Sequence, residues 1–401
     1  MQKNLYKNSY DLLQNDLKNK ILLLDGAMGT MIQQENLTAD DFGGEKYEGC
    51  NDYLVLQRPD VIKNIHKNYL EAGSDIIETN SFGALDIVLK DYDLEDTVFE
   101  MNKKAAELVN EAIAEYRSEH PEVTRNLYVA GALGPSNKSI SVTGGVTFEE
   151  LIHTYYTAVS GLMAGGVDLI LFETIQDTRN LKAAYLGLKK AMEENYTVPL
   201  MLSFTIESTG TTLAGQTADA FYYAVNHMNP FSVGLNCATG PEFMTQFLKT
   251  LNNISNTYIS VYPNAGLPNE DGEYEETPDT LSAKIEPFFQ NNYLNIVGGC
   301  CGTTPEHIQK IKEKSVNYSP RVIDENKDFN DVSGLIALET PKDRPIYVGE
   351  RTNVIGSRIF KNLIASEKFD EATEVARLQI KGRADVIDIC LANPDRDEIA
   401  D

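Results

Sequence analysis

The sequence predicts an α/β protein, a (β/α)8 TIM barrel followed by the incomplete start of a second α/β barrel segment. Short apolar runs alternate with longer amphipathic stretches from Ile21 to about Lys314, the alternation repeats eight times, and it restarts after Arg344. Near-continuous apolar strands separated by helices are typical of a parallel sheet that is covered on both faces. Eight such units are the number found in a TIM barrel.

Each strand candidate is a short, largely apolar run. The eight candidates are Ile21–Leu24, Asp75–Thr79, Leu127–Ala132, Asp168–Glu173, Pro199–Thr205, Ser232–Asn236, Tyr258–Tyr262 and Asn295–Gly298. Helices are expected after them, for example over Asp96–Tyr116, Glu149–Ala164, Thr178–Glu194, Thr277–Gln290 and Pro305–Lys314. An open doubly wound sheet is the alternative. It is less favoured because no Gly-x-Gly-x-x-Gly pattern follows the first strand.

Three regions are predicted along the chain. Residues 1–315 form the barrel, 316–344 a polar linker with one apolar patch at Val332–Leu338, and 345–401 the second segment. In that segment we expect a strand over Ile346–Gly349, a helix over Phe369–Lys381 and a strand over Asp385–Leu391. Three elements cannot bury both faces of a sheet, so we interpret the segment as the opening of a domain that has been cut off.

Composition excludes several classes of function. The net charge of −25 argues against a nucleic-acid partner, because phosphate contacts need clustered Lys and Arg. The first twenty residues are polar and do not form a secretory signal, and no apolar stretch approaches the ~20 residues of a membrane helix. We therefore expect a cytoplasmic protein without a membrane partner. Its five cysteines favour metal or catalytic roles over a disulfide framework.

Three of the cysteines fall at predicted strand ends. Thr304 suits a helix N-cap and Pro305 the first helical position, which places Cys300 and Cys301 at the end of the last strand. Cys237 directly follows the sixth strand. Because the C-terminal ends of barrel strands share one face, where barrel chemistry is located, we expect the three thiols to meet there.

Three converging thiols predict a zinc site. Zn²⁺ binds cysteine thiolates in a tetrahedron, and three protein ligands leave the fourth position for a substrate. Three thiolates and Zn²⁺ sum to −1, so the centre is suited to holding a substrate thiol deprotonated rather than to activating water. A free thiol is only a few per cent thiolate at pH 7, so this activation favours alkyl transfer to sulfur.

Other interpretations of the thiols stay open at this point. The adjacent pair could be buried free thiols or a strained vicinal disulfide. A non-catalytic zinc or redox protein could also use the three cysteines structurally, in which case a fourth protein ligand would close the site. No histidine or further cysteine lies near the three in the sequence.

Acidic residues also stand at strand ends. Asp25 ends the first strand, Glu78 the second and Glu173 the fourth. Acidic residues at these positions of a barrel are more often functional than structural, although each could instead cap a helix or pair with an arginine. Beside a thiol-activating zinc they suit a substrate with an α-amino group, whose carboxylate the backbone near Gly26 could hold.

Together these segments resemble the homocysteine S-methyltransferase family. The matching pieces are Asp25-Gly26-Ala27-Met28-Gly29-Thr30, Glu78-Thr79-Asn80-Ser81-Phe82, Gly131-Ala132-Leu133-Gly134-Pro135, Phe172-Glu173-Thr174, Gly234-Leu235-Asn236-Cys237-Ala238, Tyr262-Pro263-Asn264-Ala265-Gly266 and Gly298-Gly299-Cys300-Cys301-Gly302-Thr303. They run in the family's order over about residues 10–315. The joint match is specific, although each piece alone is weak.

The resemblance implies a ligand set. It implies zinc on Cys237, Cys300 and Cys301, and it implies that Asp25 and Glu173 hold the amino group of homocysteine. By the same resemblance the backbone near Gly26 holds the substrate carboxylate. Asn236 and Glu78 line the site.

The tail resembles the pterin-binding domain of cobalamin-dependent methionine synthases. Val348–Ser357 looks like the first strand of that domain, and Glu350 and Asn353 match pterin-contacting positions. Asp385–Asp388 fits its second strand, while Cys390 stands where many relatives have Asn. The remaining strands of that domain and the Asp-x-His-x-x-Gly cobalamin signature are absent from the sequence.

The resemblance thus implies a homocysteine S-methyltransferase that corresponds to the N-terminal part of these enzymes. A zinc-bound homocysteine thiolate would take a methyl group from methylcobalamin, carried by another domain or protein, and form methionine. The methyl group would come ultimately from methyltetrahydrofolate. The alternative is a zinc-dependent methyltransferase of the same family that uses betaine or S-methylmethionine as donor.

Overall fold

The computed structural model describes residues 6–269, 274–324, 332–338 and 343–398. These residues form two compact units. The first is the barrel, which includes the short segment Ser333–Ile336, and the second contains the C-terminal elements. Among the described residues, no helix is both long enough and apolar enough to cross a membrane.

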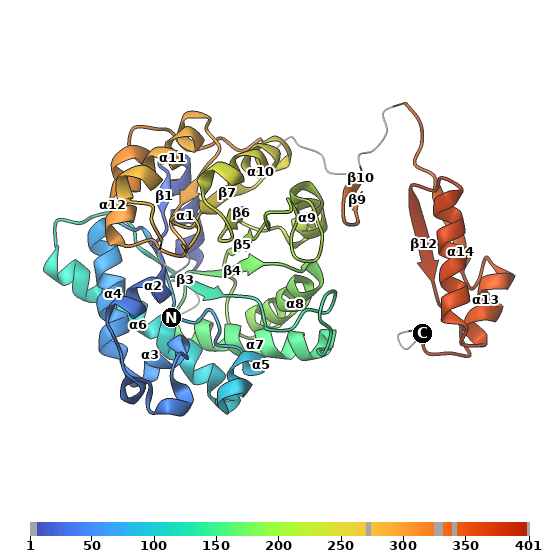
Figure 1. Cartoon of the computed structure of the whole chain (residues 1–401), viewed down its shortest axis with the longest axis horizontal. Coiled ribbons are helices and arrows are strands. Elements are labelled where there is room, and N and C mark those ends of the chain that lie inside the picture. Colours follow the sequence, from blue (N-terminus) through green and yellow to red (C-terminus); the bar gives the residue numbers. More distant parts are fainter. Residues whose placement is uncertain (1–5, 270–273, 325–331, 339–342, 399–401) are drawn as a thin grey trace. The chain divides into compact units, whose positions relative to one another are not determined.

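The first unit is built on eight parallel strands (Figure 1). They are β1 (Leu22–Leu23), β2 (Ile76–Glu78), β3 (Tyr128–Leu133), β4 (Leu169–Ile175), β5 (Leu200–Phe204), β6 (Ser232–Asn236), β7 (Tyr258–Tyr262) and β8 (Ile296–Val297). They pair in the order β1-β8-β7-β6-β5-β4-β3-β2. A single parallel bridge from Leu24 to Ile76 joins the two ends of this order. The predicted α/β fold with a TIM-like barrel is therefore confirmed.

Eight helices surround the strands. They are α4 (Pro59–Ala72), α6 (Val98–Glu119), α7 (Phe148–Gly165), α8 (Thr178–Glu194), α9 (Ala218–Val225), α10 (Pro241–Ile254), α11 (Pro278–Gln290) and α12 (Pro305–Ser315). Each of them contacts the next, and α12 contacts α4, so the outer layer closes as well. Their apolar faces bury one large core between helices and sheet. Each helix carries the chain from the C-terminal end of one strand back to the N-terminal end of the next, so all eight strands end on the same face of the barrel.

Short helices fill several connections. They are α2 (Met28–Gln34), α3 (Leu54–Gln57), α5 (Asp86–Leu89) and the 3₁₀ turns η2 (Ala39–Phe42), η3 (Glu45–Tyr47), η4 (Asn51–Tyr53), η5 (Lys90–Tyr92), η6 (Glu95–Thr97) and η7 (Asn226–Met228). Most lie in the long loops that follow β1 and β2. These loops belong to the C-terminal face, where the predicted site residues lie.

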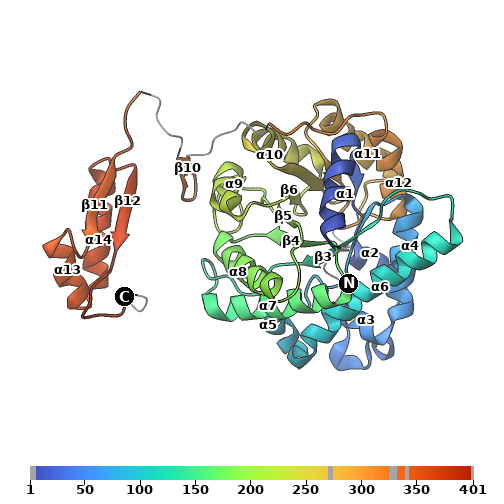
Figure 2. The same cartoon turned by 180° about the vertical axis from the view of Figure 1, so that it is seen from behind.

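An N-terminal helix closes the other end of the barrel. Helix α1 (Tyr6–Asn19) crosses this end in Figure 2, and its buried Leu13 and Leu17 join the inner core of the strands. The helix is mostly polar, and the sequence pattern did not predict it. Its two leucines are buried because they meet strand residues far away in the sequence.

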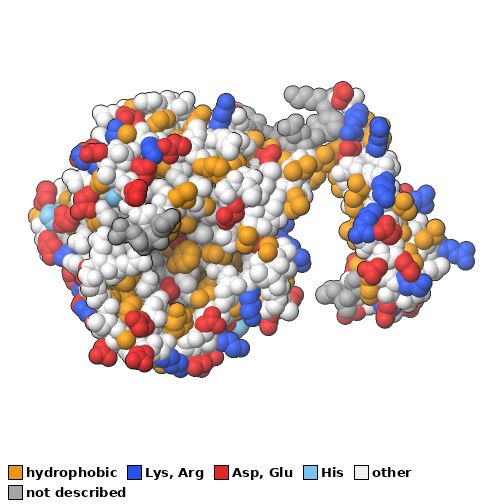
Figure 3. Space-filling view, viewed as in Figure 1, with side chains coloured by type: hydrophobic (Ala, Val, Ile, Leu, Met, Phe, Trp, Pro, Cys, Tyr) orange, Lys and Arg blue, Asp and Glu red, His pale blue; other side chains and the backbone are white. Residues whose placement is uncertain are grey.

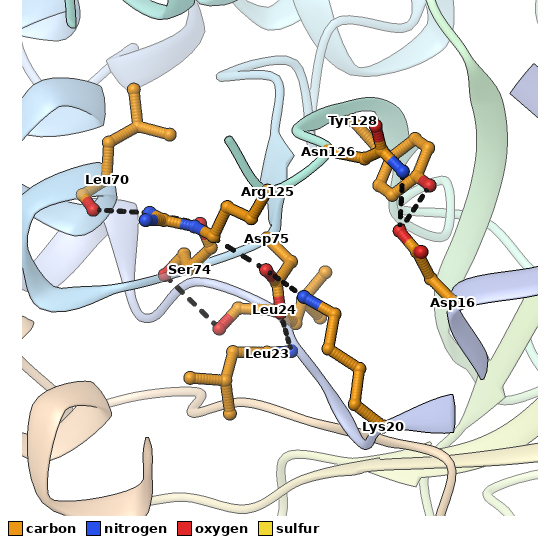
Figure 4. A network of polar contacts seen from close by, with 10 residues as sticks. All are labelled: Asp16, Lys20, Leu23, Leu24, Leu70, Ser74, Asp75, Arg125, Asn126 and Tyr128. Carbon is orange, nitrogen blue, oxygen red and sulfur yellow. Dashed lines mark hydrogen bonds and ion pairs between the residues drawn. The ribbon is translucent and has the colours of Figure 1, made fainter. Parts of the chain in front are cut away.

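Polar contacts fasten α1 to the strands around it (Figure 4). Asp16 accepts hydrogen bonds from the Asn126 amide at 3.0 Å and from the Tyr128 hydroxyl at 2.8 Å. Just after α1, Lys20 donates to Asp75 at 2.8 Å, and the backbone N–H of Leu23 donates to the same carboxylate at 3.1 Å. This end of the barrel is thus closed by both apolar and polar contacts. The opposite end, at the C-terminal ends of the strands, is therefore the one that can hold a functional site.

The predicted linker contains a small hairpin. Its strands, β9 (Val332–Ser333) and β10 (Ala337–Leu338), are formed by the residues of the predicted apolar patch. The hairpin tip contacts the barrel, because the backbone N–H of Thr217 donates to the Leu335 carbonyl at 3.0 Å and the Gln216 amide to the Gly334 carbonyl at 3.1 Å.

The C-terminal unit is a small α/β arrangement in which two helices pack beside two parallel strands. It contains β11 (Val348–Asn353), α13 (Arg358–Ala365), α14 (Phe369–Lys381) and β12 (Val386–Cys390). The two strands are parallel, and a small core of Val354, Phe360, Ile364 and Ala372 lies beside them. This is an α/β arrangement, but two strands do not by themselves show a second barrel.

Candidate metal and substrate site

The three predicted thiols lie together at the C-terminal face of the barrel. The sulfur of Cys301 is 4.0 Å from that of Cys237 and 4.0 Å from that of Cys300. All three sulfurs lie within 4.8 Å of one another, and each cysteine is partly exposed. A disulfide would need about 2.05 Å between sulfurs, so the three are free thiols. The convergence expected from the strand ends is present.

Backbone geometry directs Cys237 to this position. Cys237 and Ala238 both have positive φ, at 59° and 57°, directly after β6. Residues other than glycine rarely adopt this left-handed backbone conformation. Two such residues in succession cost free energy, which contacts in the surrounding fold must offset. The carbonyl of Tyr262, on the adjacent β7, accepts from the Cys237 N–H at 3.3 Å. The turn therefore aims one thiol toward the pair after β8.

The arrangement fits a tetrahedral zinc ion. Zn–S bonds of about 2.3 Å at tetrahedral angles place two sulfurs about 3.8 Å apart, close to the spacing found here. Among the described residues, these three form the one group of His, Cys, Asp or Glu side chains with metal-binding spacing. Three sulfur ligands would leave the fourth corner for another group. The donor set is thus that of an open zinc site.

The thiols share their protons unequally without a metal. Contacts with the thiols of Cys237 and Cys300 lower the pKa of Cys301 to about 3. The proximity of Cys300 lowers the pKa of Cys237, but the contact with Cys301 and burial outweigh this effect and raise that pKa to about 11. A divalent cation would displace the remaining protons, since cysteine binds metals as thiolate.

An irregularity in β4 places Glu173 at the C-terminal face of the barrel, where the three thiols also lie. The register between β4 and β5 shifts between Phe172 and Ile175, and Thr174 has a positive φ of 54°. For a β-branched residue this conformation is a true outlier. Such irregularities redirect side chains at the rims of barrels. Glu173 is only 6% exposed.

Asn236 stabilises that irregularity. Its side-chain oxygen accepts from the Thr174 N–H at 3.1 Å and from the Ser203 hydroxyl at 2.7 Å, and its amide donates to the Thr174 hydroxyl at 2.8 Å. Asn236 is fully buried. The predicted site residue is therefore at the site, where its contacts are to the turn that carries Glu173.

The three predicted carboxyl groups form a cluster in which Asp25 and Glu173 are buried and Glu78 is partly buried. Burial raises the pKa of Glu173 to about 8, and the negative charge of Cys301 adds to this. Burial also raises the pKa values of Asp25 and Glu78, and the charge of Glu173 contributes to both. Each group is thus in an environment that disfavours its anion unless a cation is present.

Two oxygens of the cluster lack partners. Asp25 uses one oxygen to accept from the Glu78 N–H at 3.0 Å. Among the described residues, neither the other oxygen of Asp25 nor Oε1 of Glu78 has a hydrogen-bond partner, although both atoms are buried. Buried acceptors without donors are costly, so each points to a group that the site is built to receive.

Gly26 directly follows Asp25 and packs against Thr303 and Tyr69. A Cβ at this position would come within 2.8 Å of the Thr303 hydroxyl and 2.9 Å of the Tyr69 ring, so no larger residue fits without rearrangement. The next N–H, of Ala27, donates to the Thr303 hydroxyl at 3.1 Å. The loop after β8 and the loop after β1 are thereby held together beside the thiols.

Sequence reasoning assigned no role to several residues of the site. The Tyr262 hydroxyl is buried and is close enough to Glu173 and Glu78 that their charges raise its pKa, after burial itself. The family-like segment that begins at Tyr262 pointed to this region without assigning the hydroxyl. Tyr69, Thr303 and Tyr274 were not predicted, because their contacts come from other strands and loops.

The two predicted pterin contacts lie in the C-terminal unit. Asn353 accepts from the N–H groups of Ile355 and Gly356 at 2.9 and 3.1 Å and donates to Asp388 at 3.1 Å. Glu350, on β11, is exposed. The structure therefore places both residues on β11.

Figure 3 views the barrel from the face opposite α1. Charged side chains are dense along its outer edge, and hydrophobic side chains are visible toward its middle. This distribution suits a site whose charged groups are few and buried.

Comparison with known proteins agrees with this site. A family model described as homocysteine S-methyltransferase matches residues 22–315. The homocysteine methyltransferase MmuM from Escherichia coli in its oxidized form is 23% identical, with a TM-score of 0.63 over 77% of this chain and 99% of that one. Its metallated form is 25% identical, with a TM-score of 0.62 over 74% of this chain and 97% of that one.

Proposed function

Because the chain belongs to the homocysteine S-methyltransferase family, we propose that it methylates the sulfur of homocysteine with a methyl group from methylcobalamin and forms methionine. In this reaction the new sulfur–carbon bond forms as the bond between the methyl carbon and its donor breaks. The thiol proton leaves before or during that step. The donor would be held by another domain or protein that reaches the barrel mouth.

One observation carries the assignment of the substrate. Three thiols and a buried carboxyl cluster with two unpartnered oxygens lie at the same mouth. The α-ammonium group of an amino acid supplies the donors and the positive charge that Asp25, Glu78 and Glu173 lack. Homocysteine joins that ammonium to a thiol, so one molecule satisfies both halves of the site.

Cys237, Cys300 and Cys301 would hold zinc, and the bound ion would supply the chemistry of keeping the substrate thiol deprotonated. The residues around it orient the substrate. Glu173 and Asp25 would bind the ammonium group, the backbone near Gly26 the carboxylate, and Glu78 would line the site. Asn236 would act through Thr174, by fixing the turn that presents Glu173.

The choice of donor rests on the C-terminal unit. We assign residues 1–315 to homocysteine binding, 316–344 to a linker and 345–401 to the start of a pterin-binding domain. The parallel pair of β11 and β12 agrees with such a start, and Glu350 and Asn353 would contact the pterin. An enzyme that uses betaine or S-methylmethionine has no need of a folate module.

The donor can be tested directly. The zinc-loaded protein is incubated with homocysteine and, separately, with methylcobalamin, betaine or S-methylmethionine, and methionine is measured. Methionine from methylcobalamin alone supports the proposal. Turnover with betaine or S-methylmethionine, and none with methylcobalamin, would replace the donor while leaving the homocysteine site intact.

A matched variant separates catalysis from background methylation. Cys237→Ala removes one sulfur of the triad, whereas Cys50→Ala removes a buried cysteine that lies outside it. We expect methionine formation to be lost in the first variant and retained in the second. Equal rates in both would show that the measured methylation does not use this site.

A further inference from the structure

Two loops at the C-terminal face, residues 25–30 after β1 and 298–303 after β8, are joined by hydrogen bonds that we call the clasp. One of these bonds runs from the N–H of Gly302 to the Thr30 hydroxyl at 3.0 Å. The strands that carry the two loops pair over only two residues each. The clasp therefore continues the contact between the first and the last strand into the site.

The hydroxyl of Thr303 makes two hydrogen bonds at the centre of the clasp. It donates to the Cys300 carbonyl at 2.7 Å and accepts from the Ala27 N–H at 3.1 Å. Thr303 is fully buried, so water does not compete for either bond. One oxygen atom thus connects the backbone that carries a metal-binding thiol to the backbone beside Gly26.

Tyr69, on α4, supports the same contact from outside the two loops. Its hydroxyl lies 3.2 Å from the Ala27 carbonyl and 3.2 Å from the Thr303 carbonyl. A phenol has one proton, so Tyr69 shares this proton between one acceptor on each loop. The side chain is fully buried and therefore has little freedom to leave this position.

Glycines on both loops make room for the Thr303 side chain. A Cβ on Gly26 would lie 2.8 Å from its hydroxyl oxygen, and a Cβ on Gly299 would overlap the same side chain. The N–H of Gly299 also donates to the Asp25 carbonyl at 3.1 Å. The backbones of the two loops therefore approach each other closely around one hydroxyl group.

We propose that Thr303 is a positioning residue that makes the site specific for a thiol with an α-amino acid carboxylate. Its hydroxyl fixes the backbone at Gly26 and Ala27, where the substrate carboxylate would bind, relative to the thiols of Cys300 and Cys301. The inference rests on the proposed function, since it assumes that homocysteine binds with its carboxylate at this backbone and its sulfur at the metal. Groups that are already fixed in place bind more tightly, because less conformational freedom is lost on binding.

The test compares two thiols that differ by one group. The compound 3-aminopropane-1-thiol has the thiol and the amino group of homocysteine but lacks its carboxylate. Each thiol is titrated by calorimetry into the zinc-loaded protein, and the ratio of the two dissociation constants measures the preference for the carboxylate. Thr303→Val keeps the shape of the side chain and removes both hydrogen bonds. We expect it to retain zinc and the wild-type affinity for the aminothiol, while its affinity for homocysteine falls about tenfold.

Three further variants separate positioning from a general loss of structure. Thr303→Ser retains the hydroxyl and should recover most of the preference for homocysteine. Thr257→Val removes a hydroxyl bonded to Ser255 at 2.9 Å, directly before β7 and so at the opposite end of the barrel, and should leave both affinities unchanged. Thr30→Val removes the acceptor of the Gly302 N–H, so it should lower the preference for homocysteine as well and tests the clasp where Thr303→Val does not fold.

The outcomes distinguish a failure of this inference from a failure of the proposed function. A wild-type preference for homocysteine in Thr303→Val, or in Thr30→Val where the first variant does not fold, overturns the inference. Equal losses of affinity for both thiols, or loss of zinc from Thr303→Val, overturn it too, because the hydroxyl would then serve the structure or the metal. If the wild-type protein binds both thiols equally well, the inference fails while thiol binding stands. If it binds neither, the proposed function fails as well.

Discussion

The side chain of Asn236 holds the backbone of Thr174 in a left-handed turn, and so connects the strand end that carries Glu173 to the one that carries Cys237. The amide accepts from the Thr174 N–H at 3.1 Å and donates to its hydroxyl at 2.8 Å. One buried residue thereby links the strand end of the Glu173 carboxyl group to that of the Cys237 thiol.

Asn236→Ala should weaken homocysteine binding while zinc is retained. The change leaves the Thr174 N–H without its acceptor, a loss of about 1–3 kcal/mol for a buried group, and it frees Glu173 to move. The affinity of the zinc-loaded protein for homocysteine, measured by calorimetry, should fall about tenfold or more. Ser203→Ala removes another donor to the same amide oxygen but spares both Thr174 bonds, so its effect should be much smaller. Wild-type affinity in Asn236→Ala would contradict this account.

Glu173→Gln should impair substrate binding through charge. Removing one partner of a buried ion pair costs about 2–5 kcal/mol, so homocysteine affinity should fall about 30-fold or more. Glu194→Gln, at a surface hydrogen bond with Tyr156, provides the control and should bind normally. If the two variants bind homocysteine equally well, Glu173 does not contact the ammonium group.

The stability of the metal-free, substrate-free barrel should fall as pH rises. The pKa of Glu173 is raised from 4.5 to about 8, so the folded state holds this proton more tightly than the unfolded state. Its contribution is fully present below pH 4.5 and is lost as pH rises through about 8. One such group gives a slope of at most about 1.4 kcal/mol per pH unit. Urea unfolding across this interval should show a shallower fall in Glu173→Gln, and parallel curves for both proteins would refute the assignment.

Helix α1 should contribute strongly to barrel stability. Leu17 is fully buried in the inner core, so Leu17→Ala should destabilise the barrel by about 2–5 kcal/mol. Leu12 on the same helix is 36% exposed, and Leu12→Ala should cost far less. Equal unfolding midpoints for the two variants would mean that α1 does not close the barrel in solution.

Local pattern predicted much of the fold. The helix expected over Thr178–Glu194 is α8 with the same bounds, because Asp177 caps it and its periodicity is regular. The strand ends were also placed well enough to bring Cys237, Cys300 and Cys301 to one mouth. These features depend on short stretches of sequence and on the rule that parallel strands end at the same face.

Features that depend on distant contacts were not predictable in this way. Helix α1 is mostly polar, and only the strands that it covers explain the burial of Leu17. The left-handed Thr174 depends on Asn236 two strands away, so the sequence alone could place Asn236 at the site but not state its contacts. Tyr274 lies in a loop without periodicity, and its ring packs on Gly302, which follows another strand.

The central claim is that the three cysteines bind zinc and leave a position for the thiol of homocysteine. X-ray absorption at the zinc edge, together with elemental analysis, tests it most directly. We predict one zinc per chain with about three sulfur neighbours, rising to about four when homocysteine is added. A zinc ion with an unchanged ligand set after addition of homocysteine, or stoichiometric zinc that persists in Cys301→Ala, would contradict the claim.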